Sequence, residues 1–183
     1  MRRIKVAIVG VGNCASSLVQ GVHHYADANR GDGLMHARIG GNGPFHILFV
    51  PAVDTDARKV GRDLAEAIFA PPNCTAVFHP DVPPTGVGVM MGRVLDGMAG
   101  HMVDAPAGRG FVRAEAEEAD QARMVAALRD SGAEVLINYL PVGSEEATRF
   151  YMECALEAGV AVVNCMPVFI ASRPEWEGKF RAR

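Results

Sequence analysis

The glycines that follow the first apolar run have the type and spacing of a phosphate-binding turn. Gly10, Gly12 and Ala15 form the pattern GxGxxA, directly after Ile4–Val9 and directly before a segment with helical character. The first glycine permits a tight turn, and the second lets the backbone approach a pyrophosphate, which the N-terminus of the next helix binds through its free amides. The pattern therefore predicts a dinucleotide site. A tight strand-to-helix turn that binds nothing would use the same residues.

An acidic side chain stands at the end of the second apolar run. Asp54 follows residues 45–53, where a carboxylate can accept hydrogen bonds from the adenosine ribose hydroxyls of a dinucleotide. Its charge would repel a 2′-phosphate, so this residue favours NAD over NADP. Its separation from the glycines exceeds the usual ~20 residues, because the glycine-rich segment 27–44 intervenes. Asp54 or Asp56 could instead cap the following helix, and we assign that cap to Asp56.

Two further candidate segments follow predicted strands later in the chain. The first consists of Leu140, Pro141, Val142, Gly143 and Ser144, and the second is Asn164. Ligands of doubly wound sheets bind beyond the carboxyl ends of the strands, so both segments are placed to contact a cofactor. The first is equally compatible with a plain turn in which Ser144 caps the next helix. Asn164 alone does not decide whether it faces a ligand.

The elements that must position these residues alternate along the chain. Strands are expected at residues 4–9, 45–53, 74–78, 135–140 and 160–163, and helices at 15–25, 56–69, 114–131 and 144–158. The segments 27–44 and 80–113 are rich in glycine, and we expect a long loop and an irregular segment there. The alternation predicts an α/β fold, a Rossmann-like doubly wound parallel sheet with helices on both faces.

The length of the chain and its last residues bear on the number of domains. A chain of 183 residues is sufficient for one domain, and we expect residues 1–183 to form one NAD-binding domain. Pro174 and Glu175 suit a first helical turn, but no stop signal follows in 174–183. The chain is therefore expected to end within an incomplete helix, truncated before a second domain.

The composition argues against several other classes of protein. The formal net charge is −3, with no dense basic block that would indicate nucleic-acid binding. The four cysteines lie far apart and form no CxxC pair, which argues against a structural zinc site and a disulfide framework. No apolar stretch approaches the ~20 residues that a membrane helix requires. We therefore expect a soluble cytoplasmic protein that holds no metal.

Five longer phrases resemble the actinobacterial and archaeal branch of the inositol-3-phosphate synthases, also called myo-inositol-1-phosphate synthases. They are VAIVGVGNCASSLVQG, KVGRDLAEAIFAPPNCT, DVPPTGV, NYLPVGSEEA and VNCMPVFIASRPEW. The similarity runs from Ile4 to about Phe180 and is weakest in residues 90–113.

This resemblance implies an enzyme of inositol and phospholipid biosynthesis. Such an enzyme converts glucose 6-phosphate to myo-inositol 3-phosphate with tightly held NAD, through oxidation, enolisation, aldol closure and reduction. The residues that would lie against the pyrophosphate are Gly10, Gly12, Asn13, Cys14, Ala15 and Ser16. Asp54 would hold the ribose. The nicotinamide side would be lined by Leu140, Pro141, Val142, Gly143 and Asn164.

The resemblance also implies that this chain lacks part of the enzyme. The catalytic lysines, the substrate-phosphate contacts and most of the homotetramer interface would belong to a second domain without a counterpart here, so the chain alone is expected to be inactive. Two alternatives remain at this point. One is a fragment of another NAD-dependent dehydrogenase, and the other is a stand-alone NAD-binding or redox-sensing module.

Overall fold

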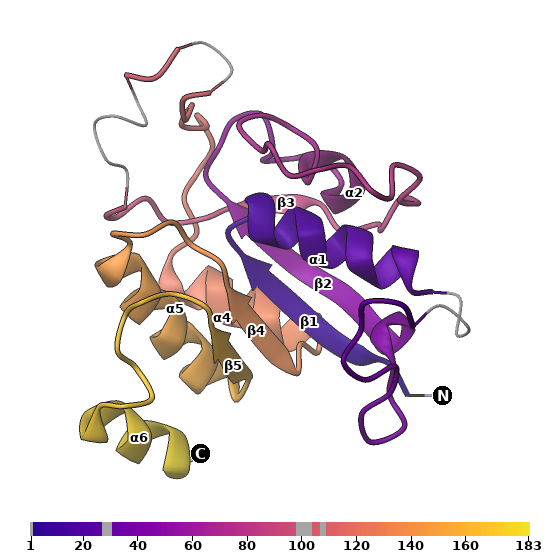
Figure 1. Cartoon of the computed structure of the whole chain (residues 1–183). Coiled ribbons are helices and arrows are strands. Elements are labelled where there is room, and N and C mark those ends of the chain that lie inside the picture. The colour runs from indigo at the N-terminus through magenta and orange to yellow at the C-terminus, as the bar shows by residue number, and fades with distance from the viewer. Residues whose placement is uncertain (1, 27–30, 98–103, 107–108) are drawn as a thin grey trace.

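A five-stranded sheet forms the centre of the molecule in the computed structural model, which describes residues 2–26, 31–97, 104–106 and 109–183 (Figure 1). The strands are β1 (Ile4–Val9), β2 (Ile47–Asp54), β3 (Val89–Met91), β4 (Val135–Asn138) and β5 (Ala161–Asn164). Their order is β3-β2-β1-β4-β5, and all neighbours are parallel. The order reverses between β1 and β4, which confirms the predicted Rossmann-like doubly wound class.

Helices cover both faces of this sheet. They are α1 (Asn13–His24), α2 (Leu64–Ala67), α4 (Gln121–Asp130), α5 (Glu145–Ala158) and α6 (Pro174–Arg181), with a 3-10 turn at Pro44–His46. One face packs against α1 and α2, and the other against α4 and α5 (Figure 1). None of the described helices is long and apolar enough to cross a membrane.

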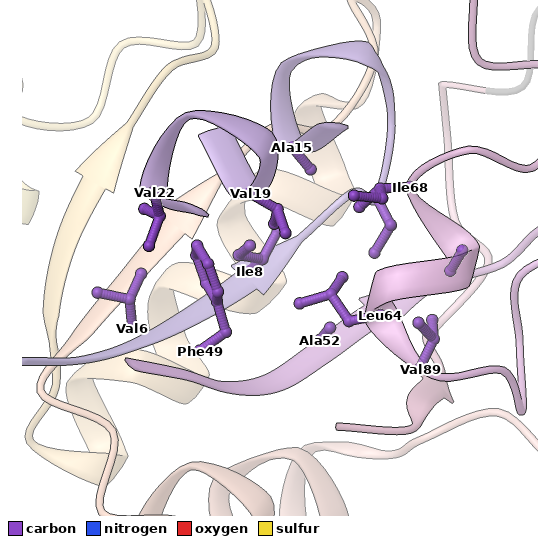
Figure 2. Packing of buried hydrophobic residues seen from close by; sticks show 12 residues of the cluster. Val6, Ile8, Ala15, Val19, Val22, Phe49, Ala52, Leu64, Ile68 and Val89 are labelled. Carbon is purple, nitrogen blue, oxygen red and sulfur yellow. The ribbon is translucent and has the colours of Figure 1, made fainter. Parts of the chain in front are cut away.

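The core is divided into two layers by β1. Val6 and Ile8 point into the layer beneath α1, where Figure 2 shows Ile8 beside Val19 and Val6 beside Val22. Ala7 and Val9 point into the opposite layer, towards α4 and α5. All four β1 side chains are at most 4% exposed. Burial on both faces explains why this strand is a continuous apolar run rather than an alternating one.

A smaller apolar cluster fixes α6 at the end of the chain. Trp176 of α6 and Ile170 pack against Met152 and Leu156 of α5. This helix lies where Pro174 and its neighbour predict a first helical turn.

The helix predicted from Asp56 to residue 69 is wrong in its first half. Only α2 is helical there, and Asp63 rather than Asp56 caps it. The residues before it turn back towards the sheet, because the N–H of Gly61 donates to the C=O of Val89 in β3. A backbone N–H that is bonded to a strand cannot also form the hydrogen bond of a helix. The contact with β3 therefore prevents a helix here, despite the helical pattern of the sequence.

The third strand is also displaced from its predicted position at residues 74–78. Those residues run beside α1, and the side-chain oxygen of Gln20 accepts hydrogen bonds from the N–H groups of Phe78 and His79, at 2.9 and 3.1 Å. The strand that pairs with β2 is instead β3, within the segment 80–113 that we expected to be irregular. Residues 27–30, 98–103 and 107–108 lie outside the described residues, so the predictions for 27–44 and 80–113 are compared only in part.

The helix predicted at residues 114–131 forms only in its second half. It begins at Gln121, where the Asp120 carboxylate accepts a hydrogen bond from the N–H of Arg123 at 2.8 Å. Before this cap, the N–H of Ala114 donates to the C=O of Thr55 at 2.9 Å. The start of this segment is thereby held beside the end of β2.

Candidate functional site

A cavity of about 450 Å³ lies beyond the carboxyl ends of β1, β2, β4 and β5, where the strand order reverses. Its wall contains eight of the twelve predicted cofactor residues, namely Gly10, Gly12, Asn13, Cys14, Asp54, Leu140, Pro141 and Val142. The four that do not line it are Ala15, Ser16, Gly143 and Asn164. In open α/β sheets this crevice is the place where ligands bind.

The two glycines of the first turn are required for different reasons. Gly10 has φ +88°, and a Cβ there would lie 2.6 Å from the carbonyl oxygen of Tyr139. This glycine is therefore needed for close packing of the turn on β4. At Gly12 a Cβ would have no neighbouring atom within 4 Å. Because that space belongs to the cavity, Gly12 leaves room for a ligand to approach the backbone.

The peptide groups of Val11, between the glycines, are held from both sides. Its N–H donates to Asp54 Oδ2 at 2.8 Å. Its carbonyl oxygen accepts hydrogen bonds from Lys59 Nζ at 2.8 Å and from Asn73 Nδ2 at 3.2 Å. The conformation of the turn is thus fixed by β2 and by the segments that follow it.

The Asp54 carboxylate ends β2 with unused hydrogen-bonding capacity. Besides Val11, the N–H groups of Thr55 and Asp56 donate to its Oδ1, at 2.7 and 2.9 Å. A carboxylate has about four acceptor sites, so one site remains. The side chain is 12% exposed and lines the cavity, which makes that site available to a ligand.

Lys59 is a buried cation in the same wall. It is 3% exposed, and its Nζ donates to the Val11 carbonyl at 2.8 Å and to Asn73 Oδ1 at 2.9 Å. Burial lowers the pKa of its ammonium group, while the charges of Asp54 and Asp56 oppose that shift. The helix predicted at residues 56–69 would have included Lys59, but the structure places this residue in the turn before α2 and in the cavity wall. No motif around Lys59 predicts its burial, because the burial results from the loss of the expected helix.

The start of α1 is attached to the segment at residues 73–75. The side-chain oxygen of Asn13 accepts hydrogen bonds from the N–H groups of Cys74 and Thr75, at 2.8 and 3.1 Å. The Asn13 side chain is therefore engaged with protein, while its backbone stays at the helix N-terminus. Ala15 and Ser16 are buried under the cavity floor rather than in its wall, and Ser16 Oγ accepts a hydrogen bond from the Gln20 side chain.

A buried ion pair follows Asp54 on the adjacent turn. Asp56 is 1% exposed, and its Oδ2 lies 2.5 Å from Arg58 Nη2, which also donates to the carbonyl of Gly110 at 2.6 Å. Burial alone would raise the pKa of the Asp56 carboxyl, but the hydrogen bonds from Arg58 and Val112 outweigh it and lower the pKa. The Arg58 guanidinium is thus engaged by protein groups and does not line the cavity.

The second half of the site is built on β4 and β5. Leu140, Pro141 and Val142 line the cavity after β4. Asn164 instead takes part in a protein network: its Oδ1 accepts from Asn138 Nδ2 at 3.0 Å, and its Nδ2 donates to the carbonyl of Val168 at 2.9 Å. The polar end of β5 therefore shapes the following loop.

The N-terminus of α5 is capped by a residue that is distant in sequence. Ser144 occupies the N-cap position, but its hydroxyl makes no capping bond, so the predicted cap is wrong. Asp96 accepts hydrogen bonds from the N–H groups of Glu146 and Ala147, at 2.6 and 2.9 Å. Burial would raise the pKa of Asp96, but these backbone bonds outweigh it and lower the pKa. Since 50 residues separate Asp96 from α5, no local pattern predicts this contact.

Two tyrosines and one cysteine of the wall have pKa values that burial raises. Burial raises the pKa of Tyr151 to about 12, and it also raises the pKa values of Tyr139 and Cys165. Nowhere in the described parts of the chain do three His, Cys, Asp or Glu side chains gather as a metal site would require. The cavity therefore offers backbone amides, the spare acceptor site of Asp54, the cationic groups of Lys59 and Arg93, and apolar surface, which suit an uncharged diol and a phosphate better than a metal ion.

Comparisons with known proteins agree with this geometry. The chain is 50% identical to proteins named inositol-3-phosphate synthase from Mycolicibacterium smegmatis and Corynebacterium glutamicum, over 97% of its own length and 47% of theirs. It therefore spans about half the length of the curated relatives it matches. No family model matches the chain.

Two solved structures share the fold. A protein named Ari2 superposes with a TM-score of 0.79 at 33% identity, over 99% of this chain and 50% of that one. A myo-inositol-1-phosphate synthase-related protein from Thermotoga maritima superposes with a TM-score of 0.73 at 22% identity, over 97% of this chain and 52% of that one. The second likeness concerns the fold alone. Over nearly its whole length, this chain is homologous to proteins named inositol-3-phosphate synthase, and it corresponds to about half of the length of each.

Proposed function

We propose that the cavity binds NAD and that the chain is the NAD-binding portion of an inositol-3-phosphate synthase. One observation carries the proposal: the glycine turn and Asp54 face one cavity at the reversal of the strand order. A Rossmann-like fold and relatives of this name both indicate a nucleotide cofactor. NAD is the form that the residues of this chain favour.

The cofactor would lie across the reversal point with its pyrophosphate at Gly12. The open space there and the free amides at the start of α1 suit two phosphates. The adenosine ribose would reach Asp54 at the end of β2. The nicotinamide would then lie towards Leu140 and Pro141, on the β4 side. NAD supplies hydride acceptance and return, and the residues of this chain hold and orient it.

The preference for NAD over NADP rests on two side chains. Asp54 offers an acceptor to a ribose hydroxyl and would repel a 2′-phosphate. In NADP sites an arginine near this position receives the 2′-phosphate. Here the candidate, Arg58, is bound to Asp56 and to the carbonyl of Gly110. A 2′-phosphate would therefore meet the Asp54 carboxylate, while Arg58 is already engaged.

The whole protein would convert glucose 6-phosphate to myo-inositol 3-phosphate. This proposal for the reaction rests on the names of relatives that are about twice as long as the chain. We place the protein in the cytoplasm, because its four cysteines are unpaired and free thiols fit a reducing compartment.

Calorimetric titration of the purified chain with NAD, and separately with NADP, tests the binding proposal. We expect saturable binding of NAD and much weaker binding of NADP. Absence of both binding heat and thermal stabilisation at millimolar NAD would refute the proposed site, because a ligand of the native state must raise the unfolding temperature.

A further inference from the structure

The buried ammonium group of Lys59 has more hydrogen-bonding capacity than the protein uses. Lysine is almost never fully buried without partners, and an ammonium group has three N–H donors. Two of them are engaged by the Val11 carbonyl and by Asn73 Oδ1, at 2.8 and 2.9 Å. Among the described residues no third hydrogen bond from Nζ is found: Asp54 Oδ2 forms an ion pair with it at 3.8 Å, which is too long for a hydrogen bond.

The spare donor and a spare acceptor therefore stand side by side in the cavity wall. Lys59 and Asp54 both line the cavity, and Asp54 retains an acceptor site after binding three backbone N–H groups. A hydroxyl group both donates and accepts a hydrogen bond. One hydroxyl placed between the two side chains could donate to the carboxylate and accept from the ammonium. A phosphate does not match this pair as well, because Asp54 would repel it.

We propose that Lys59 is a cofactor-binding residue that donates a hydrogen bond to a hydroxyl of the adenosine ribose while Asp54 accepts one from it. This inference rests on the proposed NAD site and adds a second charged group to its adenosine half. Lys59 at the same time supports the glycine turn from beneath, through the Val11 carbonyl. A lysine that only supports the glycine turn would bind the Val11 carbonyl and not the ribose. The experiment must therefore separate support of the turn from binding of the ribose.

The separating experiment pairs the variant Lys59→Met with cofactors that lack single hydroxyls. Methionine is similar in length and removes the donors. Calorimetry would measure the affinities of the unmodified chain and of K59M for NAD, and for NAD with either the 2′- or the 3′-hydroxyl of the adenosine ribose removed. We expect K59M to bind NAD about ten- to a hundredfold more weakly, as the loss of a charged hydrogen bond implies. The same substitution should weaken the binding of the analogue that lacks the contacted hydroxyl much less.

The outcomes distinguish the two proposals. An equal loss of affinity for all three ligands would show that Lys59 only supports the turn, and would overturn its assignment to the ribose. Failure of the unmodified chain to bind NAD would overturn the NAD site as well.

A second measurement leaves Lys59 unmutated, in case K59M does not fold. The chain has three lysines, so ¹³C-labelled lysine gives three side-chain signals that Lys5→Arg and Lys179→Arg variants would assign. The Lys59 signal should shift on saturation with AMP and stay in place with nicotinamide mononucleotide. An unchanged Lys59 signal at saturating AMP would also overturn the assignment.

Discussion

At the scale of single residues, Gly10 and Gly12 show how one motif combines two physical requirements. Gly10 has a positive φ, and the carbonyl oxygen of Tyr139 lies 2.6 Å from the position of its absent Cβ, so its role lies in the packing of the glycine turn on the residue after β4. Gly12 has open space at the same place, so its role concerns what enters the cavity. The sequence motif predicts one turn that contains both glycines, and the structure shows that each glycine has a different role in it.

Gly12→Val should abolish NAD binding and leave the fold intact. The added side chain would occupy the space proposed for the pyrophosphate while touching no protein atom within 4 Å of its Cβ. Circular dichroism and calorimetric titration of the same sample would check this prediction. Gly10→Ala is the matched control, and it should lower the unfolding temperature because of the contact with Tyr139. Normal binding by the Gly12 variant would show that the turn is only structural.

Asp54→Ala should weaken NAD binding by about 1–3 kcal/mol, the cost of losing a hydrogen bond to a charged group. The comparison needs a control, because Asp54 also binds backbone N–H groups. Asp63→Ala removes another carboxylate that accepts backbone hydrogen bonds, but one that does not line the cavity. It should lower stability and leave the NAD affinity unchanged. An undiminished affinity in the Asp54 variant would remove this residue from the site.

At the scale of elements, predictions succeed where local pattern and tertiary contacts agree. The run Ile4–Val9 forms β1 as predicted, because burial on both faces needs only a continuous apolar strand. The prediction for 56–69 fails because Gly61 pairs with β3 instead of continuing a helix. The strand expected at 74–78 fails for a similar reason, since Gln20 of α1 binds the amides of Phe78 and His79. Contacts between segments far apart in sequence determine the secondary structure of both regions.

Asp96→Ala should destabilise the folded chain by about 0.5–2 kcal/mol, the usual cost of losing a helix cap. Asp96 accepts hydrogen bonds from two N–H groups at the start of α5, which otherwise have no intrahelical partner. Urea unfolding without ligand would measure the loss. Ser144→Ala is the control and should change stability less, because the Ser144 hydroxyl makes no capping bond. Equal effects of the two substitutions would contradict the assignment of the cap to Asp96.

At the scale of the whole molecule, the candidate site is predictable in its first half and less so in its second. The glycine motif and Asp54 belong to a local βαβ pattern, so their place in the cavity follows from the sequence. Lys59, Arg93 and Asp96 also line the cavity, but they lie in segments whose path depends on distant partners. Asn164, predicted to face the nicotinamide, hydrogen-bonds to Asn138 and to the loop after β5 and is not among the residues that line the cavity.

The chain alone, supplied with NAD and glucose 6-phosphate, should form no inositol phosphate. The proposed reaction develops negative charge on oxygen and must hold a phosphate dianion throughout, and preorganised cations provide most of the stabilisation in such sites. Of the cationic side chains that the structure describes, Lys59 and Arg93 line the cavity. Lys59 is bound to the carbonyl of Val11 in the glycine turn, and Arg93 lies over the Phe150 ring at 5.2 Å.

The other two lysines lie away from the cavity. Lys5 Nζ donates to the carbonyl of Ser131 at 3.0 Å, at the opposite end of β1, and Lys179 of α6 pairs with Glu153. One arginine cannot both bind the substrate phosphate and stabilise an enolate, so we expect no turnover by the chain alone. A chromatographic assay for inositol phosphate would check this, with a full-length relative from Mycolicibacterium smegmatis as the positive control. Turnover at a rate of about 1 s⁻¹ or more, ordinary for enzymes, would show that the catalytic groups lie within this chain and that its cavity is a complete active site.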